Sequence, residues 1–182
     1  EQLSAERRQL LTEQASLQGR RAGVEASIES HEGLSQGSKA VLRLVRERRL
    51  TGEFQAVGEC VEVDPEFALA IETALGGAVH DLIVPTEDEA KKAISILRDE
   101  RLGRATFQPL TLVRPQSGVD LKKFSTDRGV VGRASDLVRC ESRFRPVVES
   151  LLGRILIVET LDDALVIARR GGAGRIVTLD GE

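Results

Sequence analysis

"CVEVDPEFALAIETALGG", residues 60–77, returns without a gap as "LVRCESRFRPVVESLLGR", residues 137–154. The residues that recur unchanged at this spacing of 77 are Val61/Val138, Phe67/Phe144, Glu72/Glu149, Leu75/Leu152 and Gly76/Gly153. After short gaps the match resumes, first between residues 82–94 and 156–168 and then between residues 103–110 and 174–181. This pattern favours an internal duplication over two unrelated helix–strand units that share ordinary capping residues.

Each copy predicts the same elements in the same order: a short strand, a helix, a strand, a second helix and a last strand. The middle strands are expected at Val79–Val84 and Ile155–Val158. Residues typical of helix ends bound the helices. In chain order they are Asp64 with Pro65, Gly76, Thr86, Gly153 and Thr160. The sequence therefore predicts a mixed α/β (α+β) fold with two lobes.

The composition predicts a folded core but does not indicate any particular activity. Hydrophobic residues make up 41% of the 182 residues and aromatic residues only 3%, so the core must be aliphatic. No apolar run approaches the roughly 18–20 residues that span a bilayer, and the charged N-terminal region does not resemble a signal peptide. We therefore expect a cytoplasmic protein with no membrane partner. The absence of methionine suggests a piece of a longer chain.

The N-terminal residues 1–29 predict a thin coiled-coil arm. Leu3, Leu10, Leu17 and Val24 recur at intervals of seven, with mixed charges around them. A surface helix of the same domain is the alternative. The glycines of residues 30–38 interrupt this helix, and Ser38 is placed to cap a new one that runs to about Leu50.

No catalytic, cofactor or metal site is predicted. The chain lacks a P-loop, an HExxH motif and a GxSxG motif, and no pattern points to a small-molecule substrate. Cys60 and Cys140 have no Cys or His neighbour at zinc-ligand spacing, so we expect two reduced thiols. The acidic clusters open helices, where they fit the helix dipole.

Two basic regions stand out in a chain whose net charge is −3. Residues 39–49 carry five positive charges and one negative charge, and residues 114–145 carry eight and four. A solvated surface would explain them, but contact with the phosphates of DNA is the functional alternative. The candidate DNA-binding residues are Lys39, Arg43, Arg46, Lys122 and Lys123.

The last strand of each copy follows a Gly-Arg pair. We expect these strands, Arg104–Gln108 and Arg175–Leu179, to lie at sheet edges and to pair with a second subunit, copy one against copy two. Glycines before the second strand would let two backbones approach, although Gly171 also fits a helix end. The candidate dimer-interface residues are Arg104, Thr106, Gly171, Gly172, Gly174, Arg175, Ile176, Val177 and Thr178.

Several phrases resemble the hinge domain of bacterial structural maintenance of chromosomes (SMC) proteins. They are "GSKAVL" (37–42), "GECVEVDPEFALAIETALGGAVHDLIV" (58–84), "TEDEAKKAISILRDERLGRATFQPL" (86–110) and "GRIVTLDGE" (174–182). The resemblance implies a non-catalytic homodimerisation module between two coiled-coil arms of a chromosome-condensation and segregation ATPase associated with the nucleoid. It also implies auxiliary DNA contact. A Gly-Gly segment and a returning arm that the family carries after "VTLDGE" are missing here, which leaves dimer strength open.

The resemblance gives a division into four segments. These are an arm segment (1–29), hinge lobe one (30–110), a linker or insertion (111–136) and hinge lobe two (137–182). Two other functions stay open. One is a nucleic-acid-binding module in which dimerisation is secondary, and the other is a small-molecule regulatory domain built from duplicated units. Whether any bound DNA is single- or double-stranded also stays open.

Overall fold

The computed structural model describes residues 34–115, 117–171 and 174–182. The chain divides into two compact units, Glu1–Leu34 and Ser35–Glu182, and the fold described below is that of the second. The predicted coiled-coil arm at residues 1–29 lies outside the described residues.

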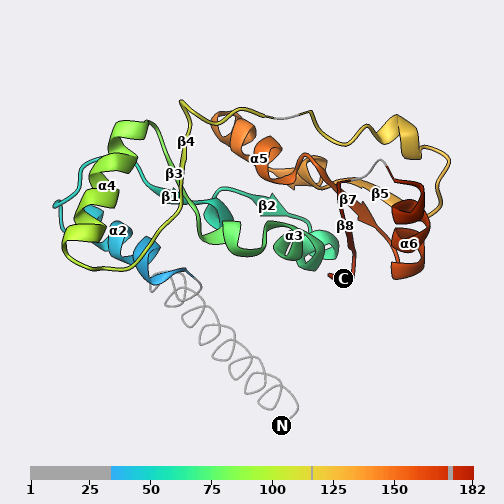
Figure 1. Cartoon of the computed structure of the whole chain (residues 1–182), viewed down its shortest axis with the longest axis horizontal. Coiled ribbons are helices and arrows are strands. Elements are labelled where there is room, and N and C mark those ends of the chain that lie inside the picture. Colours follow the sequence, from blue (N-terminus) through green and yellow to red (C-terminus); the bar gives the residue numbers. More distant parts are fainter. Residues whose placement is uncertain (1–33, 116, 172–173) are drawn as a thin grey trace, which may run out of the picture. The chain divides into compact units, whose positions relative to one another are not determined.

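The described unit alternates helices and strands, which confirms the predicted mixed fold (Figure 1). The α-helices are α2 (Gln36–Arg46), α3 (Ala68–Leu75), α4 (Glu87–Asp99), α5 (Arg145–Leu152) and α6 (Leu161–Arg170). The strands are β1 (Gln55–Ala56), β2 (Glu62–Val63), β3 (Leu82–Val84), β4 (Phe107–Pro109), β5 (Val130–Arg133), β6 (Val138–Arg139), β7 (Ile155–Val158) and β8 (Arg175–Thr178). Short 3-10 helices are η1 (Val57–Glu59), η2 (Pro65–Phe67), η3 (Gly76–His80), η4 (Leu121–Phe124), η5 (Ala134–Asp136) and η6 (Ser142–Phe144).

The duplication is visible in the sheets. One sheet has the order β1-β3-β4 and the other the order β5-β7-β8. In both, the first strand pairs antiparallel and the last strand parallel with the central strand. The bounds of η2 and α3 repeat 77 residues later as those of η6 and α5. The predicted internal duplication is therefore confirmed, with α4 and α6 as the crossover helices.

The two copies meet along a third, two-stranded sheet. β2 pairs antiparallel with β6, and Glu62 lies opposite Arg139 while Val63 lies opposite Val138. Because Glu62 and Arg139 are 77 positions apart, the ladder pairs a residue with its own counterpart in the other copy. A local two-fold axis between the copies therefore passes through this seam.

The structure aligns the last strands of the two copies, β4 and β8, in a different register from the sequence alignment. Leu82 and Leu156 are equivalent in the two LIV strands; Leu82 pairs with Phe107, and Leu156 pairs with Ile176. Phe107 is therefore the counterpart of Ile176. The gapless alignment of residues 103–110 with 174–181 would have matched Phe107 to Thr178, so it is wrong by two residues. The shared Gly-Arg pair misled it, because the connection that follows α4 is longer.

Helix ends follow the sequence signals with some differences. Thr86 forms a full capping box with Glu89, and the Thr160 side chain accepts the Asp163 N–H, as expected. α2 begins earlier than predicted, because the Ser35 side chain accepts the Ser38 N–H at 3.2 Å. The Ser38 hydroxyl is buried and donates to the His80 carbonyl at 2.8 Å.

Other predicted element bounds agree with the structure only in part. Gly76 and Gly153 end α3 and α5 as predicted. The first LIV strand begins at Leu82, since residues 76–80 form η3. Asp64 precedes η2, but its side chain makes no cap hydrogen bond. Residues 111–136, expected to carry little regular structure, contain η4, η5 and the sheet strand β5.

One core cluster contains residues of both copies. It includes Ile71 of α3, Val148 of α5 and Ile157 of β7, all at most 2% exposed. Each fully buried Ile or Val contributes about 1.5–3 kcal/mol to stability. A second cluster, with Leu156 and Ile167, covers the other face of the β5-β7-β8 sheet beneath α6. The lobes therefore share the first of these clusters.

Candidate functional site

The candidate site consists of the two outer strands, β4 and β8. In a parallel ladder the N–H and C=O of alternate residues point to alternate sides. The Arg175 N–H donates to Arg154 and the Leu179 N–H donates to Val158, so the odd-numbered residues of β8 face β7. Ile176 and Thr178 therefore turn their backbone groups away from the sheet.

The outward-facing backbone N–H and C=O of Thr178 already form hydrogen bonds with the C-terminal residues of the same chain. Its N–H donates to the Glu182 carbonyl at 3.1 Å, and its carbonyl accepts the Gly181 N–H at 3.0 Å. The Thr178 hydroxyl also accepts the Glu182 N–H at 3.0 Å. Among the described residues, no backbone hydrogen bond joins the outward groups of Ile176 to another segment. The open part of the β8 edge is thus centred on Ile176.

β4 has the same arrangement. The Leu82 N–H donates to the Thr106 carbonyl and the Leu110 N–H donates to the Val84 carbonyl, so Phe107 and Pro109 face outward. Pro109 has no N–H, as suits an edge position, and its carbonyl accepts the N–H groups of Leu112 and Val113. Within the described residues, the open part of this edge is centred on Phe107, the counterpart of Ile176.

The side chains of Phe107 and Ile176 lie on corresponding faces of their sheets. Ile176 packs against the cluster that contains Ile167 of α6. The Phe107 ring meets the Phe54 ring edge-on, with centroids 6.4 Å apart. Phe54 lies beside Gly52, which is also next to Glu89 of α4. Each edge residue therefore points toward its crossover helix.

The other predicted interface residues have varied surroundings. Val177 and Thr178 are buried, and Gly172 lies outside the described residues. Gly171 ends α6 with φ of 74°, and a Cβ there would meet nothing within 4 Å. A Cβ on Gly174 would lie 2.9 Å from the Arg154 carbonyl. Gly171 and Gly174 thus have roles within the subunit, at a helix end and in a close backbone approach.

Arg175 reaches into the other copy. Its guanidinium donates to the Thr73 carbonyl at 2.8 Å and to the Ala74 carbonyl at 3.0 Å. These carbonyls belong to the last turn of α3, which lacks helical partners and carries the negative end of the helix dipole. Arg175 therefore fixes the start of β8 on α3.

Arg104 and Thr106 precede β4 and are exposed. The Arg104 backbone packs against Gly37 near the start of α2. Gln108 Nε2 donates to the Asp81 carboxylate at 2.8 Å. Burial of Asp81 raises its pKa, against the opposing hydrogen bonds from Gln108 and Thr106.

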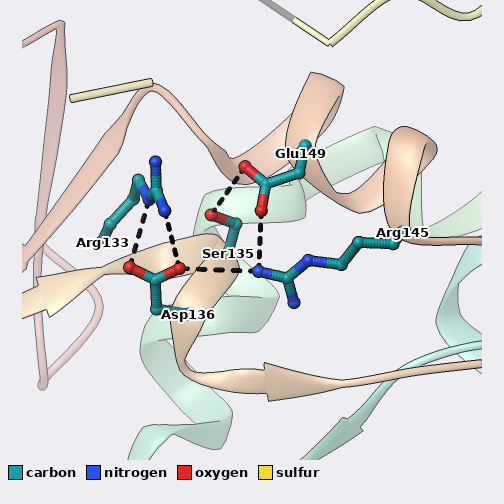
Figure 2. Close-up of polar contacts among 5 residues, drawn as sticks. All are labelled: Arg133, Ser135, Asp136, Arg145 and Glu149. Carbon is teal, nitrogen blue, oxygen red and sulfur yellow. Dashed lines mark hydrogen bonds and ion pairs between the residues drawn. The ribbon is translucent and has the colours of Figure 1, made fainter. Parts of the chain in front are cut away.

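A polar cluster in the second copy was not predicted from the sequence. Figure 2 shows it between η5 and α5. Its members are Arg133, Ser135, Asp136, Arg145 and Glu149. Arg133 donates twice to Asp136, at 2.9 and 3.2 Å. Arg145 lies 2.7 Å from Glu149 and 3.5 Å from Asp136, and the Ser135 hydroxyl donates to Glu149 at 3.3 Å.

This cluster braces η5 on α5. The matching positions of the first copy hold Ala56, Gly58, Glu59, Ala68 and Glu72, which cannot form it. It is therefore a feature of one lobe, and it lies away from the two outer strands that the copies share.

The predicted DNA-binding residues form two separate surface clusters. Arg43 and Arg46 are exposed on α2 and Lys39 is partly exposed on the same face, while Lys122 and Lys123 are exposed on η4. α2 packs on α4, whereas η4 packs on β5, so the clusters belong to different sheets. Phe124, next to the two lysines, is only 3% exposed and is thus unavailable for stacking on a base.

The surroundings of the metal-ligating residue types and of Cys60 can be described in the same way. No three His, Cys, Asp or Glu side chains among them are placed to hold a metal ion. Burial raises the pKa of Cys60 to about 12, helped by nearby Glu59, so this thiol stays protonated at neutral pH. A groove of about 140 Å³ lies between β3 and η6, lined by Ile83, Leu110 and Phe144 among others. Among the described residues, no helix is long and apolar enough to cross a membrane.

Comparison with known proteins gives one consistent result. The family model for the flexible hinge domain of SMC proteins matches residues 50–168. The chromosome partition protein Smc of Halothermothrix orenii is 38% identical over 157 residues, which cover 85% of this chain and 13% of that protein. The corresponding protein of Bacillus subtilis is 37% identical over 153 residues, covering 82% of this chain and 13% of that protein. The chain thus spans about 13% of the length of these relatives.

Solved structures agree with the sequence relatives. An asymmetric dimer of the Geobacillus stearothermophilus SMC hinge domain matches with a TM-score of 0.81 and 33% identity, covering 91% of this chain and 66% of that one. The Pyrococcus furiosus SMC hinge domain matches with a TM-score of 0.67 and 28% identity, covering 87% of this chain and 80% of that one.

Proposed function

The chain belongs to the family of SMC flexible hinge domains, and we propose that it is the homodimerisation module of a chromosome-partition protein. In this proposal the chain joins two coiled-coil arms at the nucleoid and does no chemistry. The ATPase activity expected of the parent protein resides in domains outside this chain.

The observation that carries the proposal is the matched pair of open sheet edges. β4 and β8 are the outer strands of equivalent sheets, and within the described part of the chain each edge is open at the same structural position, Phe107 or Ile176. An edge with unsatisfied backbone groups favours pairing with another strand. One chain that carries two such equivalent edges is suited to a closed dimer.

In the proposed dimer, β4 of each subunit pairs with β8 of the other. Two such junctions are related by one two-fold axis, which closes the assembly into a ring and leaves neither edge open. Antiparallel pairing lets Phe107 and the partner's Ile176 exchange both N–H···O bonds directly. It also places their side chains on the same face, where cross-strand pairs stabilise a sheet.

Proline substitution at Ile176 tests this junction. The Ile176 N–H points outward, so proline removes the donor offered to the partner while leaving the ladder to β7 intact. We expect a folded protein whose dimer dissociates at least about tenfold more readily, because each junction loses a hydrogen bond. Analytical ultracentrifugation measures the dissociation, and circular dichroism confirms the fold.

Val177→Pro is the matched control, because the odd-numbered residues of β8 bond to β7 and proline there should disrupt the fold itself. An Ile176→Pro protein that is folded and as dimeric as the parent would contradict the edge pairing. A parent chain that stays monomeric at millimolar concentration would contradict the proposed function.

We further propose auxiliary DNA contact through charge. Arg43 and Arg46 lie on the exposed face of α2, within a segment that holds five positive charges and one negative charge. Contacts of this kind bind phosphates without reading bases, so affinity should fall steeply with salt. The burial of Phe124 favours this mode over base stacking.

The double variant Lys39→Glu/Arg43→Glu tests the α2 face. We expect weaker binding to a short duplex at low salt and a shallower salt dependence than the parent. Lys122→Glu/Lys123→Glu is the matched variant for η4, with the same change in charge. Parent-like affinity of the α2 variant would remove this face from the DNA site. DNA binding by a monomeric Ile176→Pro protein as tight as the parent's would favour a nucleic-acid module in which dimerisation is secondary.

A further inference from the structure

α6 carries an apolar stripe on its surface. Leu161 is 47% exposed and Leu165 is 46% exposed, and the exposed Ala168 continues the same side of the helix at i+7. The buried side of α6 is separate and centres on Ile167. Large exposed apolar side chains in a row on one helix are suited to contact with another surface.

The contacts of α6 show which way the stripe faces. On one side, Asp163 lies against Gly129 and Arg170 forms an ion pair with Asp127, so this side faces the loop before β5. Ile167 faces the sheet. By helical periodicity, Leu161 and Leu165 lie on the side opposite Asp163 and Arg170. The stripe therefore faces away from β5 and over the outer edge of β8.

α4 is oriented in the corresponding way over β4. Glu100 forms an ion pair with Arg49 at 2.5 Å on the side of the β1 connection. Ile94 lies about 120° around the helix from Glu100 and is 49% exposed. Glu87 accepts a hydrogen bond from Thr111, just after β4, at 2.5 Å. Ile94 thus faces over the outer edge of β4.

We propose that α4 of one subunit packs against α6 of the partner subunit, forming a helix seam above each strand junction of the dimer. The proposal rests on the dimerisation proposed above. Both crossovers, β3-α4-β4 and β7-α6-β8, join parallel neighbouring strands, and such crossovers are almost always right-handed. Phe107 and Ile176 each point toward their crossover helix. A β4–β8 junction therefore places the two helices on the same face of the combined sheet.

The seam would be antiparallel, because each crossover helix runs against its own edge strand and the edge strands run against each other. Ile94 then meets the partner's Leu165 and Leu161. Arg98, in the last turn of α4, faces the partner's Asp162 in the first turn of α6. At the other end, the acidic first turn of α4 faces the partner's basic Arg169. The apolar contact of Ile94 and the opposite charges at both ends favour this pairing. Lys91 lies on the same side of α4 as Ile94 and is 3.6 Å from Asp88 of its own helix.

Leu165→Lys tests the apolar centre of the seam. We expect the dissociation constant of the dimer to rise by about tenfold or more, because a charged ammonium would be placed in an apolar contact. The matched control is Val166→Lys, the same change one residue further along the same helix. Val166 is 54% exposed and lies about 100° further around α6, away from the seam. The control should dimerise like the parent.

A charge swap tests the ends of the seam. Arg98→Asp and Asp162→Arg should each weaken the dimer severalfold, and the double variant should recover most of the loss, since each homodimer would again pair opposite charges. Sedimentation equilibrium at low and high salt measures all four proteins. Equal dimer constants for Leu165→Lys and Val166→Lys, or no recovery in the double variant, would overturn the seam. If the helix seam is overturned in this way but Ile176→Pro still weakens the dimer, the proposed β4–β8 strand junction remains supported and only the α4–α6 contact is wrong.

Discussion

Glu62 and Arg139 lie directly opposite each other in the β2–β6 ladder, and each is the other's counterpart in the duplication. Arg139 also donates to both carboxylate oxygens of Asp64, at 2.7 and 3.1 Å. The seam between the copies is therefore held by a small ladder and a bidentate ion pair above a shared apolar core.

Asp64→Asn should weaken the β2–β6 contact between the two copies in a pH-dependent way. The hydrogen bonds and charge of Arg139 lower the pKa of Asp64 in the folded state. Such a carboxyl adds stability above its unfolded pKa, and this contribution is lost as the pH falls through the folded pKa. We expect the variant to be less stable than the parent at pH 7 and closer to it at about pH 2, with a smaller difference at high salt.

Urea unfolding at the two pH values measures this difference. Glu66→Gln, an exposed acid on the adjacent η2, serves as the control and should follow the parent throughout. A stability loss in Asp64→Asn that is the same at both pH values would show that the carboxylate charge is not responsible.

Asp81→Asn should change stability at pH 7 in the opposite direction, making the protein more stable than the parent. Asp81 is 9% exposed, and its burial raises its pKa. A carboxyl with a raised folded pKa costs stability as the pH rises through that pKa, whereas below its unfolded pKa it costs none. Asparagine keeps an acceptor for Gln108, so the variant should be more stable than the parent at pH 7 and equal to it at about pH 3. Thermal unfolding across this range measures the effect, and a destabilised variant at pH 7 would show that the charged hydrogen bonds outweigh burial.

Gly37→Ala should damage the contact between α2 and the segment before β4. A Cβ on Gly37 would lie 2.8 Å from the Arg104 nitrogen and nearer still to its carbonyl, so backbone must move. We expect a loss of about 2–4 kcal/mol in the free energy of unfolding. Gly77→Ala is the control, because a Cβ there meets nothing within 4 Å. A Gly37→Ala protein as stable as the Gly77→Ala protein would show that α2 shifts without cost.

The two thiols should differ in reactivity. Cys60 is buried with its pKa raised to about 12, while Cys140 is partly exposed. Only the thiolate is a good nucleophile, so Cys60 should resist alkylation in the native protein. Mass spectrometry after iodoacetamide treatment at about pH 8 should find Cys140 modified first and both thiols modified only after unfolding. Prior modification of Cys60 in the native protein would contradict this environment.

The elements that local signals define were predictable from the sequence. Thr86 and Thr160 lie before apolar helices with acids in the first turn, and both cap as expected. The strand Ile155–Val158 is apolar throughout and is buried throughout, as the sequence predicted. The equal spacing of the copies was visible because no insertion separates the elements between residues 60 and 77.

What depends on pairing was not predictable. Phe107 was not among the candidate interface residues, because its match to Ile176 follows from the register against the LIV strands and not from the Gly-Arg pairs. β5 was missed because Val130–Arg133 contains a bulge and a glycine, which hide the alternation of a strand. The polar cluster of Figure 2 joins residues from separate elements, which a single sequence does not bring together.

The seam at β2–β6 also bears on ancestry. A two-fold axis inside one chain is what duplication and in-frame fusion of the gene for a self-pairing half-length protein would leave. After fusion the halves no longer have to be identical, because a substitution in one is not repeated in the other. The Arg133–Glu149 cluster, which the first half lacks, records that freedom. One half could thus acquire features of its own while both kept the outer strand inherited from a common ancestor.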